Sequence, residues 1–194
     1  KNYLQQQPGF EDFFITVDPK TDLSAVTRPR ALPLLTPFQM RDHSTRHLWT
    51  TFSDDQIDLN YRSPEVLLAM VDVLLCYLEK GAEYVRLDAV GFMWKEPGTN
   101  CIHLEKTHLI IKLLRSIIDN VAPGTVIITE TNVPHKDNIA YFGAGDDEAH
   151  MVYQFSLPPL VLHAVQKQNV EALCAWAQNL TLPSSNTTWF NFLA

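Results

Sequence analysis

Two acidic residues that could do chemistry stand at the ends of two short apolar runs. Asp88 ends the run Glu83-Tyr84-Val85-Arg86-Leu87-Asp88, and Glu130 ends the run from Thr125 onward. Side chains alternate across a strand, so Arg86 and Asp88 share one face. A neighbouring guanidinium favours the charged form of a carboxylate, and two nearby carboxyl groups can serve as nucleophile and as proton donor. Either residue alone could instead cap the helix that follows its strand.

Helices and strands that could position these residues alternate from about residue 61 onward. A first helix is predicted from Ser63 as N-cap, with Pro64 at the first helical position and Gly81 beyond its end. The expected elements after it are a strand at 83–88, a helix at 103–120, strands at 125–130 and 150–155, a long helix at 158–179 and a strand at 187–193. Residues 1–60 are predicted to be loops and short strands.

This alternation predicts an α/β protein with a parallel sheet, because parallel neighbours require a crossover that is usually a helix. Both a doubly wound sheet and a barrel satisfy it. Two carboxylates at the C-terminal ends of successive strands favour a barrel, because (β/α)8 enzymes place their chemistry there. A complete barrel needs about 250 residues, and the chain has 194.

Composition excludes several function classes. The chain is 46% hydrophobic, and its net charge of −7 disfavours nucleic acid and anionic membranes as partners. No apolar run approaches the 18 residues of a membrane span. Three widely spaced cysteines predict neither a disulfide framework nor a zinc site, and the seven histidines lack metal-ligand spacing. We therefore expect no metal and a cytoplasmic location with reduced thiols.

Several blocks of sequence resemble glycoside hydrolase family 13, the α-amylase family. Three stretches of this chain look like signature regions of the family. They are Asp55-Gln56-Ile57-Asp58-Leu59-Asn60-Tyr61, Arg86-Leu87-Asp88-Ala89-Val90-Gly91-Phe92 and Thr129-Glu130-Thr131-Asn132. The blocks 28–38, 94–99 and 152–160 are similar to the sucrose phosphorylase subfamily, and the stretch 130–135 with Tyr141-Phe142-Gly143 to its glucosylglycerate phosphorylase branch. Classical sucrose phosphorylases generally carry a His where this chain has Asn132.

The resemblance implies a partial (β/α)8 TIM barrel that spans about strands 4 to 7. Residues 1–60 would be the C-terminal part of the inserted domain B. Residues 61–194 would be the central portion of the catalytic barrel, truncated at both ends. A third catalytic carboxylate and the rest of the barrel would lie outside the chain, so the isolated piece could be inactive.

The activity implied is that of a retaining α-glucosyl phosphorylase, with Asp88 as nucleophile and Glu130 as acid/base. A small α-glucoside, sucrose or glucosylglycerate, would react with phosphate through a covalent glucosyl-enzyme to give α-glucose 1-phosphate. Inorganic phosphate would be a co-substrate, with no other cofactor. The alternatives are a hydrolase or transglucosidase of the same family and a non-catalytic relative. The sequence leaves open the acceptor, whether glycerate, fructose or another sugar, and the oligomeric state.

Other residues are implied to bind substrate beside Arg86. Arg28 and Arg30 would border the acceptor site, where a guanidinium fork suits phosphate or carboxylate, although both could be solvated surface residues. Phe52 and Gln56 match positions that line sugar subsites in relatives, and Phe52 could equally pack in the core. Asn132 could contact the acceptor or serve as a turn residue.

Overall fold

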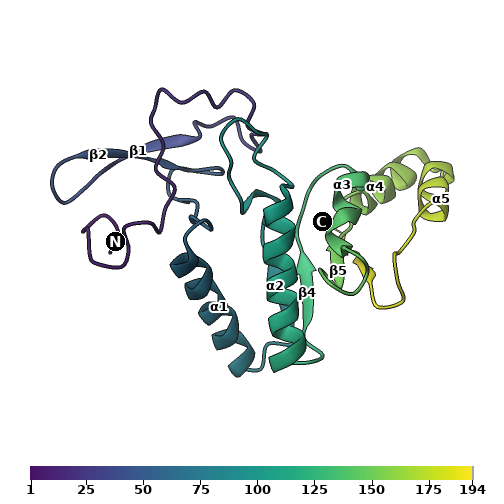
Figure 1. The fold of residues 1–194 in the computed structure, drawn as a ribbon. Helices are drawn as coiled ribbons and strands as arrows, with labels where there is room; N and C mark the ends of the chain where they lie inside the picture. The colour runs from purple at the N-terminus through teal and green to yellow at the C-terminus, as the bar shows by residue number, and fades with distance from the viewer. Residues whose placement is uncertain (194) are drawn as a thin grey trace. The chain divides into compact units, whose positions relative to one another are not determined.

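The computed structural model describes residues 1–193, and these form two compact units (Figure 1). The first unit comprises Lys1–Glu79 and Gly91–Thr107, and the second comprises Lys80–Val90 together with the residues from His108 onward. The boundary expected at residue 60 between an inserted domain and a barrel stays a prediction, and its far end at Ala194 lies outside the described residues.

The first unit contains a β-hairpin and one long helix. Strands β1 (Leu35–Gln39) and β2 (Thr45–Trp49) pair antiparallel, which agrees with the short strands predicted for this region. Helix α1 (Pro64–Glu79) begins where Ser63 and Pro64 predicted it. Gly81, at φ +84°, adopts the left-handed conformation beyond its end, which glycine tolerates without steric cost.

The second unit contains a four-stranded parallel sheet. Its strands are β3 (Tyr84–Leu87), β4 (Val126–Thr129), β5 (Met151–Tyr153) and β6 (Thr188–Phe190). They lie in the order β3-β4-β5-β6, and each pairs parallel with the next. A doubly wound sheet reverses its strand order at a switch point, and this sheet does not. The order is that of a stretch of a (β/α)8 barrel, so the predicted fold class is confirmed.

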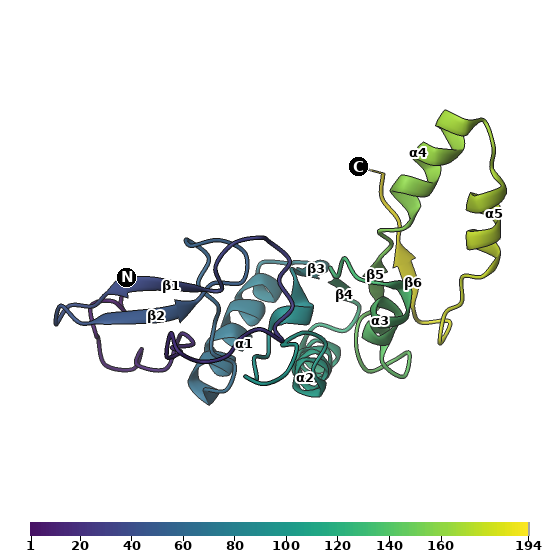
Figure 2. The same ribbon diagram turned by 90° about the horizontal axis from the view of Figure 1, so that it is seen from above.

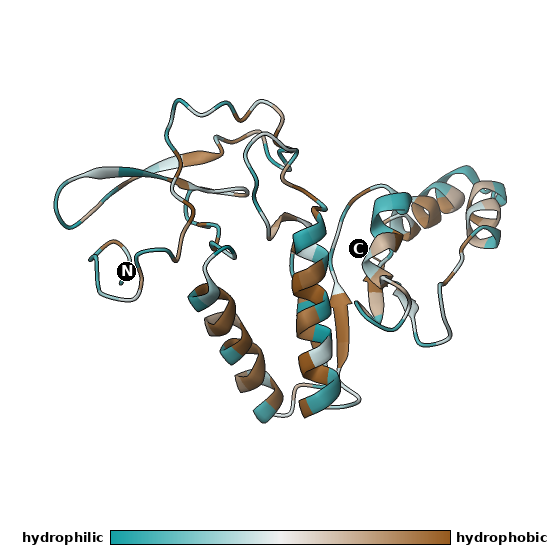
Figure 3. Cartoon of the chain, in the orientation of Figure 1, coloured by the Kyte–Doolittle hydropathy of each residue, from teal (hydrophilic) through white to brown (hydrophobic). Residues whose placement is uncertain are grey.

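Helices connect the strands of this sheet. Helix α2 (Glu105–Val121) runs beside β4 and presents an apolar face that contains the buried Ile111 and Ile118 (Figures 1 and 3). A short helix α3 (His135–Ile139) follows β4 and was not predicted. The 3-10 turns η1 (Val90–Phe92) and η2 (Ala140–Phe142) complete the connections before β5. No helix in the described part of the chain is both long and apolar enough to cross a membrane.

The single long helix predicted over 158–179 is wrong. The segment forms two helices, α4 (Leu157–Lys167) and α5 (Glu171–Gln178), which Figure 2 shows separately. Gln168 ends α4 in the left-handed conformation at φ +50°, and the Asn169 N–H returns to the Ala164 carbonyl over 3.1 Å. The Asn169 side chain then accepts the Glu171 N–H over 2.8 Å. These bonds turn the chain and start the second helix.

Candidate active site

Asp88 and Glu130 follow directly after neighbouring strands of the parallel sheet. In the β3–β4 register Arg86 stands opposite Ile128, and the Glu130 N–H donates to the Leu87 carbonyl over 3.0 Å. Two residues further along this register, Asp88 falls beside Glu130. Because side chains alternate on both strands, the two carboxyl groups leave the same face at the C-terminal edge of the sheet. This is the edge at which barrel enzymes carry out their chemistry.

The Arg86 guanidinium is shared by both carboxyl groups. Its Nη1 lies 2.6 Å from Asp88 Oδ1, and its Nη2 lies 4.0 Å from Glu130 Oε2. Burial opposes the charge of Arg86, but Asp88, Tyr153 and Glu130 outweigh burial, so the pKa of Arg86 is raised above its ordinary value. Arg86 therefore stays a cation. The Asp88 and Glu130 carboxyl groups lie beside the two terminal nitrogens of its planar guanidinium group.

The two carboxyl groups differ in their surroundings. The side chain of Asp88 is 69% exposed, whereas that of Glu130 is 21% exposed. Glu130 Oε2 also accepts the backbone N–H of Ala89 over 3.0 Å. An open carboxylate can reach an incoming carbon atom, and a carboxyl held by a backbone donor keeps a defined direction. The geometry thus suits Asp88 for attack and Glu130 for directed proton transfer.

An aromatic residue that sequence reasoning missed completes this face. Arg86 lies over the ring of Tyr153, 5.5 Å from its centroid, and Tyr153 is the last residue of β5. Tyr153 stands opposite Phe190 in the β5–β6 register, and their ring centroids are 4.7 Å apart. The available signal was the same two-residue period that placed Asp88 and Glu130, because Met151 and Tyr153 share a face of their strand.

Among the remaining predicted site residues, only Asn132 belongs to this unit. It is exposed, two residues beyond Glu130. Arg28 and Arg30, in the first unit, are both exposed, and Arg28 lines a hollow of about 590 Å³ with residues of the 19–35 segment. Their predicted anion-binding role stays a prediction.

Phe52 and Gln56 also belong to the first unit. Phe52 is half-buried, with its ring edge-on to Phe92 at a centroid distance of 5.4 Å. Gln56 is exposed, and its Oε1 accepts the Ser53 hydroxyl over 2.9 Å. Their roles at a sugar subsite stay predictions.

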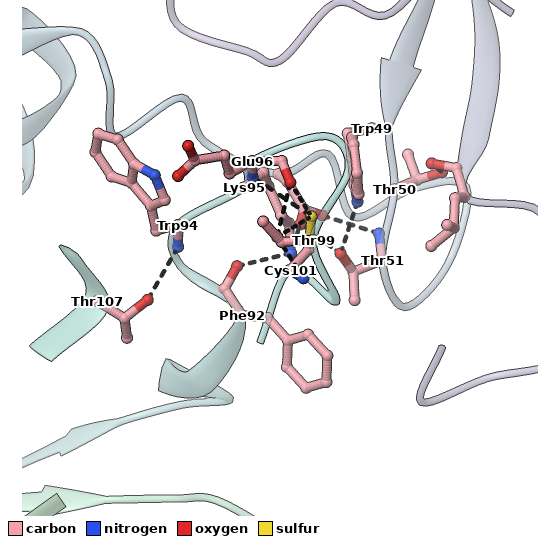
Figure 4. A network of polar contacts seen from close by, with 12 residues as sticks. Trp49, Thr50, Thr51, Phe92, Trp94, Lys95, Glu96, Thr99, Cys101 and Thr107 are labelled. Carbon is pink, nitrogen blue, oxygen red and sulfur yellow. Dashed lines mark hydrogen bonds and ion pairs between the residues drawn. The ribbon is translucent and has the colours of Figure 1, made fainter. Parts of the chain in front are cut away.

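A buried ion pair, also missed from the sequence, holds the segments of the first unit that carry Phe52 and Phe92. Figure 4 shows Lys95 of this pair together with Phe92 and Thr51. Lys95 Nζ lies 2.9 Å from Asp58 Oδ2 and donates to the Phe92 carbonyl over 2.7 Å. Asp58 in turn accepts the Thr51 N–H over 2.9 Å and its hydroxyl over 2.5 Å. Burial lowers the pKa of Lys95, although the charge of Asp58 acts in the opposite direction.

A parallel sheet in barrel order, with paired carboxylates at its C-terminal edge, is the arrangement of a glycoside-processing barrel. Residues 1–192 match the model of the α-amylase catalytic domain, so the chain belongs to the α-amylase family, glycoside hydrolase family 13. The family resemblance inferred from the signature blocks is confirmed.

Several curated relatives match this chain over its whole length. It is 97% identical over 194 residues to glucosylglycerate phosphorylase of Escherichia coli (strain K12), and 58% identical over 194 residues to glucosylglycerate phosphorylase of Allomeiothermus silvanus. In each case the match covers 100% of this chain and 35% of the relative. The chain therefore spans about a third of the length of these relatives.

A solved structure supports the fold. The crystal structure of sucrose 6F-phosphate phosphorylase from Thermoanaerobacter thermosaccharolyticum matches 93% of this chain and 38% of its own, with a TM-score of 0.78 and 24% sequence identity. At this identity the likeness concerns the course of the backbone, and it agrees with the barrel order of β3 to β6.

Proposed function

We propose that the full-length protein to which this chain belongs is a retaining α-glucosyl phosphorylase that acts on glucosylglycerate. The observation that carries this is the placement of Asp88 and Glu130 on two nitrogens of the same Arg86 guanidinium. The choice of glucosylglycerate as donor, in place of sucrose, rests on the names of relatives that match the whole chain.

In the first step the Asp88 carboxylate attacks the anomeric carbon of the donor glucose. The bond between this carbon and the glycerate oxygen breaks, and its electron pair stays on oxygen. The protonated Glu130 carboxyl transfers its proton to that oxygen, so glycerate leaves with a neutral hydroxyl. Asp88 then holds the glucose as an ester of inverted anomeric configuration. Arg86 remains paired with Glu130 and orients both carboxyl groups.

In the second step a phosphate oxygen attacks the same carbon from the face that glycerate left. The ester bond to Asp88 breaks, and the carboxylate is restored. Glu130, now ionised, accepts the proton of the attacking phosphate hydroxyl. Two inversions give α-glucose 1-phosphate with overall retention, and the enzyme returns to its starting protonation state. Inorganic phosphate is thus a co-substrate, and the reaction requires no further cofactor.

The remaining substrate-binding assignments extend this proposal. Arg28 and Arg30 supply guanidinium groups for phosphate or for the glycerate carboxylate. Phe52 packs against the sugar ring, Gln56 binds sugar hydroxyls, and Asn132 contacts the acceptor. Residues 1–60 belong to an inserted domain B and residues 61–194 to the barrel. The protein acts in the cytoplasm, with no nucleic acid or membrane partner.

The test is a phosphorolysis assay on the full-length protein with glucosylglycerate and with sucrose, with and without inorganic phosphate. We expect glucose 1-phosphate to form only with phosphate, and faster from glucosylglycerate. Asp88→Asn and Glu130→Gln should each lower kcat by about 1000-fold or more. Release of free glucose at the same rate without phosphate would show a hydrolase and reject the proposal.

A second assay examines the arginine pair. The double substitution Arg28→Ala with Arg30→Ala should raise the KM for phosphate or for glucosylglycerate by about 10-fold or more, because it removes charge-assisted hydrogen bonds. Arg41→Ala is the matched control, since Arg41 is another exposed arginine of the same unit. Unchanged KM values for both substrates in the double variant would remove Arg28 and Arg30 from the site.

A further inference from the structure

The shared guanidinium of Arg86 raises the question of what holds its plane. Its side chain is 45% exposed, and its ion-pair partners in the described part of the chain are the two carboxyl groups themselves. A guanidinium with this freedom could orient neither carboxyl group. The Tyr153 ring packs against it at 5.5 Å, within the range of a cation–π contact, and the Tyr153 side chain also hydrogen-bonds to Arg86. Tyr153 therefore supplies a surface that sets the orientation of Arg86.

Tyr153 is itself fixed by an aromatic cluster, which consists of Tyr153, Phe155, Phe190 and Phe192. Its ring centroid lies 5.6 Å from that of Phe155, 4.7 Å from that of Phe190 and 5.2 Å from that of Phe192. Phe155 and Phe192 are also in edge contact at 5.2 Å. A ring with neighbours of this kind has few rotamers open to it, so it can serve as a platform.

The backbone of Tyr153 is tied to the residue after Glu130 by a buried amide. Asn138 Nδ2 donates to the Tyr153 carbonyl over 2.8 Å, and Asn138 Oδ1 accepts the Thr131 hydroxyl over 2.5 Å. Asn138 is 3% exposed and Thr131 is 4% exposed. Asparagine carries a donor and an acceptor on one rigid group, so it can bond both segments at once. Asn138 thus sets the position of β5 relative to the end of β4.

We propose that Tyr153 and Asn138 are positioning residues of the catalytic centre. The Tyr153 ring holds the plane of Arg86, and through Arg86 it aligns Asp88 and Glu130. Asn138 holds Tyr153 at the correct distance from Glu130. The inference rests on the proposed function, because it assigns the two residues to the alignment of its nucleophile and its acid/base.

The first experiment separates the ring of Tyr153 from its hydroxyl in the full-length enzyme. Tyr153→Leu and Tyr153→Met remove the ring, whereas Tyr153→Phe keeps it. We expect both non-aromatic variants to lose about 100-fold in kcat, with KM for glucosylglycerate within about 3-fold of wild type, because misalignment of reacting groups costs about this much. Tyr153→Phe should stay within about 3-fold of the wild-type kcat. Urea unfolding identifies which non-aromatic variant is folded and suitable for comparison.

A second donor shows how the loss arises. The donor is α-glucosyl fluoride, whose leaving group, fluoride, departs without being protonated. The first step then needs no acid catalysis. We expect Glu130→Gln to recover its rate of glucosyl-enzyme formation with α-glucosyl fluoride, and Tyr153→Leu not to recover. The reason is that Arg86 would misalign Asp88 as well as Glu130 when the ring is lost. Full recovery of Tyr153→Leu would contradict alignment of Asp88 through Arg86.

Asn138 is tested by Asn138→Asp, which keeps the acceptor for Thr131 and removes the donor to Tyr153. The control is Asn179→Asp, because Asn179 Nδ2 donates to the Ala175 carbonyl over 2.7 Å at an exposed helix end. We expect at least about a 10-fold lower kcat for Asn138→Asp, because a buried carboxylate loses the bond to the Tyr153 carbonyl and repels that oxygen, and no change for Asn179→Asp.

The outcomes distinguish this inference from the proposed function. If the wild-type enzyme releases no glucose 1-phosphate in the presence of phosphate, the proposed function fails. If the wild-type enzyme is active and the non-aromatic Tyr153 variants keep its kcat, only the positioning inference fails. A Tyr153→Phe variant as slow as Tyr153→Leu would also overturn it, because the hydroxyl and not the ring would then be responsible.

Discussion

The backbone N–H of Ala89 donates a hydrogen bond to Glu130 Oε2 over 3.0 Å, so the residue after one carboxylate holds the other. Ala89 achieves this at φ +46°, in the left-handed region that costs a residue with a Cβ about 1 kcal/mol. Backbone strain of this kind concentrates at functional sites. The strained turn directs the Ala89 N–H at Glu130, while the Asp88 side chain extends from the end of β3.

Substitutions at Ala89 should reveal this strain. Ala89→Gly should leave the free energy of unfolding unchanged or raise it by up to about 1 kcal/mol, because glycine tolerates the left-handed region. Ala89→Val should lower it by about 2 kcal/mol and reduce kcat, because a β-branched residue resists positive φ and moves the N–H away from Glu130. Urea unfolding and the phosphorolysis assay measure the two effects. Equal stability of the Val and Gly variants would contradict the strained turn.

Breaking the buried pair of Lys95 and Asp58 should destabilise the protein more than breaking an exposed pair does. Lys95→Met should cost about 3 kcal/mol of unfolding free energy, because it leaves the Asp58 carboxylate without its cation. Adding Asp58→Asn should restore part of this loss in a double-mutant cycle. The control is Lys112→Met. Lys112 is 40% exposed, and the substitution removes its 2.6 Å pair with Asp147 and a longer 3.9 Å contact with Glu148. It should cost at most about 1 kcal/mol. Similar losses from both lysine substitutions would count against the role of burial.

Gly143 occupies a position where an added Cβ would meet the side chains of Asp147 and Glu148. Its backbone is at φ +59° and ψ −133°, and an added Cβ would lie 2.1 Å from Asp147 Oδ1 and 2.9 Å from Glu148 Cγ. Gly143→Ala should therefore lower the unfolding free energy by about 3 kcal/mol. Gly124→Ala is the matched control, because Gly124 has φ +100° but open space around its Cβ position, and it should cost only about 1 kcal/mol. Thermal unfolding of both variants tests the difference.

His150 should make stability depend on pH. Its Nδ1 accepts the Ile127 N–H over 3.0 Å, which requires that nitrogen to be unprotonated. Burial and the charge of Arg115 lower the pKa of His150 below 6.5, against the opposite effect of Asp119. As pH falls, the folded state therefore binds a proton at His150 at a lower pH than the unfolded state does. Its stabilising contribution is complete above pH 6.5 and is lost as pH falls toward the lowered pKa.

The test compares wild type with His150→Asn, whose amide oxygen can accept the Ile127 N–H and does not titrate. Urea unfolding between about pH 8 and 5 should show a steeper loss of stability below pH 6.5 in wild type than in the variant. Parallel stability curves for the two proteins would show that His150 does not contribute.

Local patterns in the sequence determined the elements and the face on which the reactive residues lie. Ser63, Pro64 and Gly81 mark the ends of α1 because caps and terminal glycines act over a few residues. The two-residue period of a strand placed Arg86 with Asp88, and put Glu130 at the end of the next strand. The family signatures around these residues were also readable without coordinates, and the match of residues 1–192 confirmed them.

The partners of these residues were decided only by the tertiary structure. Arg86 meets Glu130 and Tyr153 because three strands pair in one register, and register depends on contacts between distant segments. The bridge from Thr131 through Asn138 to Tyr153 depends in the same way on distant segments. Even the break at Gln168 escaped the local pattern, since a left-handed glutamine is rare and the apolar spacing continues through it. Periodicity acts within one element, whereas a catalytic centre is made where several elements meet.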